Sequence, residues 1–147
     1  MQWQQKTFDQ LTTLELYQIL RLRSEVFVVE QKCIYQDIDN KDFSAIHLFL
    51  TENNEIVAYC RLLPQGVSAP EATIGRIIVA PSHRGKHLSR LIMQQAMEIA
   101  INDWHQKRIY IQAQARLTKF YHSFGFISSS DAYLEDGIPH FDMIWQQ

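Results

Sequence analysis

The sequence predicts an α+β fold in which helices flank a mixed, mostly antiparallel sheet. Three β-rich runs follow one another between residues 45 and 80 with no helical stripe between them, which excludes a doubly wound parallel sheet. Apolar residues recur at helical spacing before these runs, at 12–27, and after them, at 88–100. Near the C-terminus, Asp136-Gly137 is a strong hairpin signal between two strand-like runs.

The chain is expected to begin with a short strand at residues 2–8, followed by a helix. Thr12 and Glu15 have the spacing of a capping box, in which each side chain satisfies a free backbone amide of the first turn. Residues 30–45 are polar and acidic, and predict a loop or a broken helix. The stripe of the predicted helix consists of Leu16, Ile19, Leu20, Arg23, Val26 and Phe27.

Two strands are predicted next, at residues 45–52 and 56–65. The turn between them is expected at Asn53-Asn54, because asparagine tolerates the left-handed conformation. A loop at 66–71 leads to the third β-rich run, at 72–80, which is rich in branched residues.

A second helix is predicted from Arg84 onward, followed by a strand at 108–114. A short third helix is expected to end at Gly125, where a C-cap glycine would lie, before the two C-terminal strands. The buried face of the second helix is predicted to consist of Leu88, Leu91, Ile92, Ala96, Ile99 and Ala100. The stripe of the third helix consists of Leu117, Phe120, Tyr121 and Phe124.

Length and composition favour one soluble domain spanning residues 1–147. The N-terminus does not read as a secretory signal and no long apolar run predicts a membrane span, so a cytoplasmic protein is expected. The formal net charge of −2 argues against a nucleic-acid-binding domain, which usually carries a basic face. Two cysteines without an export signal are expected to be reduced thiols.

The junction between the third β-rich run and the second helix carries the sharpest chemical signal. Pro81 ends the strand, and Arg84, Gly85 and Lys86 lead into the helix. Free backbone amides and the helix dipole make such a junction an anion site, and glycine allows close approach of a ligand. The alternative is a solvated basic helix start without a ligand. Neither the Walker phosphate loop nor the dinucleotide glycine motif is present.

The segment from Val79 to Leu91 resembles the acetyl-CoA signature of the GNAT N-acetyltransferases. The matching positions are Val79, Pro81, Arg84, Gly85 and Leu91. His87 stands where that family usually has glycine, and Ser89 where it has glycine or alanine.

A later segment, with Phe120-Tyr121 and Gly125-Phe126, resembles the second motif of the same family, and Gln114 stands where the family often has asparagine. The N-terminal run LRSEVFVVEQKCIYQDID and the later EDGIPH are similar to the ElaA subgroup, in which a non-glycine residue at the position of His87 is a trait.

The resemblance implies a GNAT fold and direct transfer of an acetyl group from acetyl-CoA, the co-substrate, to a primary amine of a small molecule or peptide. No metal is implied. The residues that would hold acetyl-CoA are Ile77, Ile78, Val79, Arg84, Gly85, Lys86, His87, Leu88, Ser89, Gln114 and Tyr121.

Tyr121 is the candidate acid that protonates the departing thiolate, although its place on an apolar stripe also suits a core residue. The base is left open among Glu30, His47, Glu71 and His140, or a water that relays the proton. Cys33 and Cys60 are unpromising as nucleophiles for a covalent intermediate.

The acidic residues Asp37, Asp39 and Asp42 are expected either to attract a cationic amine or to form a solvated loop. A non-catalytic, CoA-binding regulatory protein is the competing function. Exposed strands of the C-terminal hairpin could also pair two copies into a homodimer.

Overall fold

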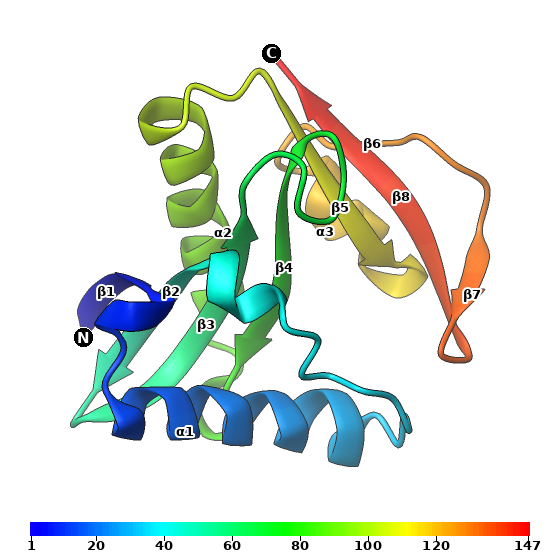
Figure 1. The fold of residues 1–147 in the computed structure, drawn as a ribbon. Helices are drawn as coiled ribbons and strands as arrows, with labels where there is room; N and C mark the ends of the chain where they lie inside the picture. The colour runs from blue at the N-terminus through cyan, green and yellow to red at the C-terminus, as the bar shows by residue number, and fades with distance from the viewer.

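The computed structural model describes residues 1–147 and consists of one eight-stranded sheet with helices on both faces (Figure 1). The strands run in the order β1-β2-β3-β4-β5-β8-β6, with β7 also paired to β8, and only β4 and β5 are parallel. The strands are β1 (Gln2–Thr7), β2 (Ile46–Glu52), β3 (Glu55–Leu63), β4 (Ala72–Val79), β5 (Arg108–Gln114), β6 (Ile127–Ser128), β7 (Tyr133–Glu135) and β8 (Ile138–Gln146). The helices are α1 (Thr13–Arg23), α2 (Leu88–Glu98) and α3 (Thr118–His122). The predicted α+β fold is confirmed.

The first helix begins at the predicted capping box. The Thr12 hydroxyl accepts from the Glu15 amide at 3.0 Å, and the Glu15 carboxylate accepts from the Thr12 amide at 2.9 Å. The helix then widens into a π-helical segment at Ser24–Glu30, where the backbone hydrogen bonds skip one residue further. Arg23, at the end of α1, is fully buried.

Both predicted hairpin turns are confirmed. Asn53 and Asn54 have φ angles of 51° and 64°, and Asp136 and Gly137 have 51° and 78°. Two consecutive residues at positive φ form the turn whose twist matches that of antiparallel strands, and these residue types adopt it at low cost.

The two faces of the central sheet are covered by different helices. On one face, Ile19 and Val26 pack with Phe49, Tyr59 and Ile78 of the strands. The other face packs against α2 and α3, and full burial of each aliphatic side chain there contributes about 1.5–3 kcal/mol. The alternation of strand side chains explains this division. The buried residues of α2 are Leu88, Ile92, Met93, Ala96 and Met97.

Two predictions for α2 are wrong. Leu91 is 46% exposed, because the buried face turns toward Met93 and Met97 and leaves Leu91 outside the buried arc. The helix begins at Leu88 rather than Arg84, because the chain first forms a 3₁₀ turn at Pro81–His83 and then turns again.

The middle of the sheet opens between β4 and β5 (Figure 1). These parallel strands pair only at Ala72–Ile109 and Thr73–Tyr110, and then diverge toward their C-terminal ends. Opposite β3, one extra residue is accommodated in β4 between Gly75 and Ile78, with Arg76 at a φ of 51°. This bulge kinks β4 where the divergence begins.

Candidate active site

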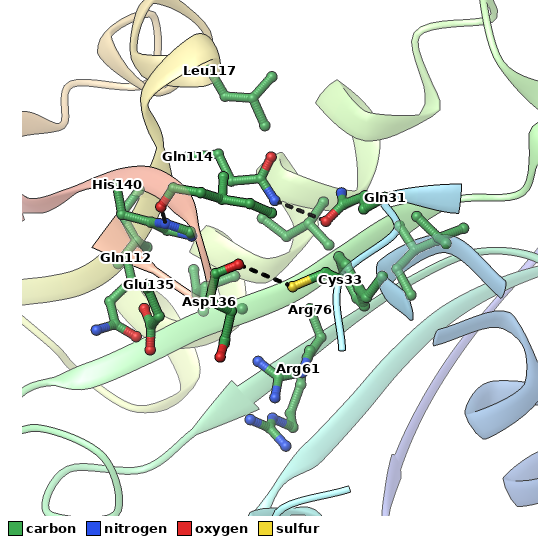
Figure 2. Close-up of a pocket in the computed structure, with 18 of the residues that line it drawn as sticks. Gln31, Cys33, Arg61, Arg76, Gln112, Gln114, Leu117, Glu135, Asp136 and His140 are labelled. Atoms are coloured by element: carbon green, nitrogen blue, oxygen red, sulfur yellow. Dashed lines mark hydrogen bonds between the residues drawn. The ribbon is translucent and has the colours of Figure 1, made fainter. Parts of the chain in front are cut away.

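A cavity of about 720 Å³ lies where β4 and β5 diverge (Figure 2). Its walls come from these two strands, from the π-helical segment Ser24–Glu30 and the loop after it, and from the turn between β7 and β8. Beyond Thr73, the edge of β4 that faces the cavity pairs with no strand. Backbone groups of Ile77–Val79 are therefore available to an extended ligand.

The loop with the predicted anion site follows the C-terminal end of β4, and Gly85, Lys86, His87, Leu88 and Ser89 lie outside the cavity lining. Arg84 lines the cavity, and its guanidinium donates to the Val79 carbonyl at 3.4 Å and forms an ion pair with Glu30 at 2.8 Å. Gly85 has a φ of 82°, and the following Lys86 is exposed.

His87 is the N-cap of α2, with a φ of 60° and no capping hydrogen bond from its side chain. It therefore adopts the left-handed conformation that glycine adopts most easily, with its imidazole exposed. The side chain of Leu88 is buried in the core, so only its backbone can face a ligand, and Ser89 is half-buried. The first intrahelical bond runs from the Leu91 amide to the His87 carbonyl at 3.2 Å, which leaves the preceding amides free of helical acceptors.

Tyr121 lies both in the core and at the cavity. Its ring contacts Phe120 and Phe126 edge to face, while the residue lines the cavity wall. Burial raises the pKa of Tyr121 to about 12, and its hydroxyl has no hydrogen-bond partner in the chain. The two interpretations offered for Tyr121 are thus compatible, because the ring and the hydroxyl have different surroundings.

Two contacts join opposite walls of the cavity (Figure 2). The Gln114 amide donates to the Gln31 side-chain oxygen at 3.3 Å, and the Cys33 thiol donates to the Asp136 carbonyl at 3.4 Å. Both contacts link the segment after α1 to the C-terminal half of the sheet. Cys60, by contrast, is buried in β3, and burial raises the pKa of its thiol.

The candidate bases lie in different surroundings. Glu30 lines the cavity, but the hydrogen bond and charge of Arg84 lower the pKa of its carboxyl and make it a weaker base. Glu71 does not line the cavity, and its carboxylate lies 3.6 Å from Arg108.

His47 is fully buried and does not line the cavity either. Burial lowers the pKa of its imidazole. Its Nε2 donates to the Asp42 carbonyl at 3.0 Å and its Nδ1 accepts from the Tyr59 hydroxyl at 2.8 Å, so neither nitrogen is free. His47 and Glu71 are therefore separated from the residues that line the cavity.

His140 lines the cavity from β8. Its Nδ1 lies 2.7 Å from the Ile138 carbonyl, which requires a proton on Nδ1 and leaves the lone pair of a neutral imidazole on Nε2. The ring stacks on Tyr133, whose hydroxyl donates to Asp142 at 2.7 Å. Two neighbours thus hold this imidazole in one orientation.

Both expectations for Asp37, Asp39 and Asp42 are wrong. Their carboxylates are not placed to attract a cationic amine, and they do not form a solvated loop. They pair with arginines of α1, β3 and β4. Asp37 pairs with Arg23 at 2.9 Å and with Arg76 at 2.7 Å. Asp42 pairs with Arg23 at 2.6 Å and with Arg61 at 3.1 Å.

Arg61 and Arg76 line the cavity and were not among the predicted site residues. The sequence signal that was missed is Arg61 in an otherwise apolar strand, since a charge there needs buried partners. No group of three or more histidine, cysteine or carboxylate side chains could hold a metal ion, and none of the helices has the length and apolar character needed to cross a bilayer.

Comparison of the chain with known proteins identifies its family. Residues 9–147 match the model of the acetyltransferase (GNAT) domain. The chain belongs to the GNAT acetyltransferase family. This membership makes it an acyl-CoA-dependent acyltransferase and confirms the resemblance that the two sequence motifs indicated.

The chain is also similar to individual GNAT proteins. It is 41% identical to the protein ElaA of Escherichia coli K12 over 97% of this chain and 95% of that protein. The crystal structure of E. coli ElaA superposes with a TM-score of 0.92 and covers 99% of each chain. An acyl-CoA N-acyltransferase from Pseudomonas aeruginosa superposes with a TM-score of 0.93 at 38% identity over 99% of each chain. At 13% identity and a TM-score of 0.70, the PaiA N-acetyltransferase of Thermoplasma acidophilum, solved in complex with coenzyme A, shares the fold, with 100% of each chain covered.

Proposed function

We propose that residues 1–147 form one N-acetyltransferase domain that moves an acetyl group from acetyl-CoA to a primary amine of a small molecule or peptide. Transfer is direct, within a complex that holds both substrates. The observation that carries the proposal is one cavity that is lined by the open edge of β4, by Tyr121 and by Arg84 of the loop before α2.

The donor half of the cavity suits acetyl-CoA in three respects. The free amides at the start of α2 and the positive end of its dipole attract a pyrophosphate, with Arg84 and Lys86 adding charge. The unpaired backbone of Ile77–Val79 matches the amide groups of an extended pantetheine arm. An amide of Ile78 or Val79 would polarise the thioester carbonyl. Ser89 and Gln114 complete the predicted contacts.

The reaction exchanges one bond for another and requires two proton transfers, one from the amine and one to the departing thiolate. The amine nitrogen attacks the thioester carbonyl carbon, a C–N bond forms, and the C–S bond breaks. Tyr121 protonates the departing thiolate, and its raised pKa keeps the hydroxyl protonated at neutral pH. His140 accepts a proton from the attacking amine at Nε2, because Nδ1 is committed to the Ile138 carbonyl.

His140 is preferred to the other candidate bases on position and availability. Glu30 is tied to Arg84 in an ion pair, which favours its role in orienting that arginine at the cavity. His47 and Glu71 do not line the cavity. A covalent acetyl-cysteine intermediate is not needed, because the Cys33 thiol donates to a carbonyl and has no base beside it.

The test is release of free CoA thiol from acetyl-CoA with a panel of primary amines, amino acids and short peptides. Direct transfer predicts intersecting lines in double-reciprocal plots and full activity in Cys33→Ser. Parallel lines, with loss of activity in Cys33→Ser, would show a covalent route instead. Acetyl-CoA binding without thiol release by any amine would favour the non-catalytic regulatory alternative.

A further inference from the structure

The side chains of Arg61 and Arg76 lie together in the wall of the cavity (Figure 2). Arg61 pairs in register with Gly75, and Arg76 follows at the bulge of β4. Arg84 lies beside Val79, three residues further along that strand. Neither Arg61 nor Arg76 is among the residues expected to hold acetyl-CoA.

Both guanidinium groups are held in fixed orientations by carboxylates. Asp39 accepts from Arg61 at 2.8 Å and 2.9 Å in a two-pronged pair, and from Arg76 at 3.5 Å. Asp37 accepts from Arg76 Nε at 2.7 Å, and the Arg76 guanidinium also lies 5.7 Å from the ring centre of Tyr35. Neither aspartate lines the cavity, so the cavity wall at this end is formed by the arginines and not by their counter-charges.

Donor capacity remains on Arg76 after these pairs are counted. Arg76 donates through Nε and Nη2, while its Nη1 donates to no group of the chain, and the Arg76 side chain is 24% exposed. Arg61 Nε also lacks a hydrogen-bond partner, but it is buried, so a ligand in the cavity cannot reach it. The donor that is open to a ligand at this part of the cavity is therefore that of Arg76.

The backbone conformation of Arg76 also indicates a ligand site. Its φ of 51° is uncommon for a residue other than glycine, and residues held in such conformations concentrate at ligand sites. The bulge at this residue brings the guanidinium to the cavity at the point where β4 and β5 separate.

We infer that the acceptor amine also carries a carboxylate, and that Arg76, with Arg61 beside it, binds this group. The inference rests on the proposed acetyl transfer and narrows its substrate to amines of the amino-acid type, free or at the terminus of a short peptide. A planar carboxylate accepts well from guanidinium donors. Other lining residues, His140, Glu135 and Asp136, suit the ammonium group of the acceptor.

The first experiment compares acceptors that differ only in the carboxylate. Each amino acid is assayed beside its own amide and its decarboxylated amine, at equal concentrations of the neutral amine, by release of CoA thiol. The carboxylate form is expected to have a kcat/KM higher by about tenfold or more, the range for a charge-assisted hydrogen-bonded pair. Dipeptides and their amides separate the two sources of the carboxylate, and a preference in either series supports the inference.

Variants then test which residue causes the preference for acceptors with a carboxylate. Arg76→Gln is expected to remove the preference for the carboxylate by raising KM for that acceptor, while KM for acetyl-CoA is unchanged. Arg108→Gln is the matched control, since Arg108 is exposed and outside the cavity lining. An equal loss for acceptors with and without a carboxylate would assign Arg76 a structural role and overturn the inference. Equal turnover of the acid, amide and amine by the wild type would do the same without any variant.

A binding measurement separates this inference from the proposed function. The CoA complex of the wild type is titrated calorimetrically with amino acids, N-acetyl amino acids and the corresponding amides. Selective binding of the acids without any turnover would uphold the carboxylate site and refute acetyl transfer. Binding of neither acids nor amides, or of both equally, would overturn the carboxylate site even if other amines are acetylated.

Discussion

Tyr121 illustrates how one residue serves the core and the site together. Its ring fills space between Phe120 and Phe126, while its hydroxyl lacks a partner in the chain. Packing energy comes from the ring, and any chemistry comes from the hydroxyl. A substitution that removes the oxygen alone can therefore separate the two.

Tyr121→Phe is expected to lower kcat by about 100-fold, the lower end of the range for loss of a general acid. KM for acetyl-CoA should change little, and so should the free energy of unfolding, since the lost hydroxyl makes no protein hydrogen bond. Steady-state kinetics and denaturant unfolding measure these quantities. Unchanged turnover would remove the role of Tyr121 as the acid.

His140→Gln tests the base through the rate of transfer. The substitution removes the imidazole that presents its Nε2 lone pair to the cavity. The variant is expected to have a kcat lower by about 100-fold, measured by release of CoA thiol, while KM for acetyl-CoA changes little. His105→Gln, a change at an exposed residue outside the cavity, is the control. A variant that keeps the wild-type kcat would exclude His140 as the base.

At the scale of elements, the start of α2 depends on two residues at positive φ. Gly85 has a φ of 82° and His87 a φ of 60°. The first position is occupied by the residue that adopts such angles easily, and the second is not. An added Cβ at Gly85 would meet no atom within 4 Å, so a substitution there tests backbone conformation alone.

Opposite outcomes are expected for His87→Gly and Gly85→Ala. The first relieves a left-handed conformation and should leave KM for acetyl-CoA unchanged while raising the free energy of unfolding by up to about 1 kcal/mol. The second imposes strain of about 1 kcal/mol and should raise KM for acetyl-CoA. Thermal unfolding and initial rates measure both. Weaker acetyl-CoA binding in His87→Gly would mean that the imidazole itself contacts the ligand.

At the scale of the whole molecule, an ion-pair cluster links segments that are distant in sequence; its members are Arg23, Arg61, Arg76, Asp37, Asp39 and Asp42. It joins α1, the acidic loop, β3 and β4, and two of its arginines, Arg61 and Arg76, line the cavity. Removing one member of a buried pair is costly, because the remaining charge keeps its desolvation penalty without compensation.

Asp42→Asn is expected to destabilise the fold by about 3–5 kcal/mol, the range for breaking a buried ion pair. Asp42 accepts from both Arg23 and Arg61, so the substitution weakens two pairs. Asp9→Asn, a change at an exposed aspartate, is the control. Denaturant unfolding measures the difference, and a loss equal to that of the control would show that the cluster adds little stability.

The cluster also predicts an acid-induced loss of stability. Burial opposes ionisation of Asp39, but the hydrogen bond and charge of Arg61 outweigh it and lower the pKa of Asp39 from 3.8 to about 2. A carboxyl whose pKa is lower in the folded state contributes stability above its unfolded pKa, and this contribution is lost as pH falls from about 4 toward 2. Asp39→Asn should flatten this part of the curve of unfolding free energy against pH, and an unchanged curve would contradict the assignment.

Local patterns in the sequence predicted most of the fold and indicated the family. The capping box at Thr12 and the hairpin turns at Asn53-Asn54 and Asp136-Gly137 depend on residues adjacent in sequence, so the sequence alone predicts them. The motif from Val79 to Leu91 can be recognised from the spacing of its own residues. Together with the later motif around Tyr121, it indicated the family.

Only the tertiary structure decided what the acidic run does. Asp37, Asp39 and Asp42 were expected to attract a cation or to face solvent, yet they orient arginines that come from other strands and from α1. It also brought His140 to the cavity and left His47 and Glu71 outside it. The physical reason is that a charge or a lone pair acts on whatever lies within a few ångströms, and pairing between distant segments determines those neighbours.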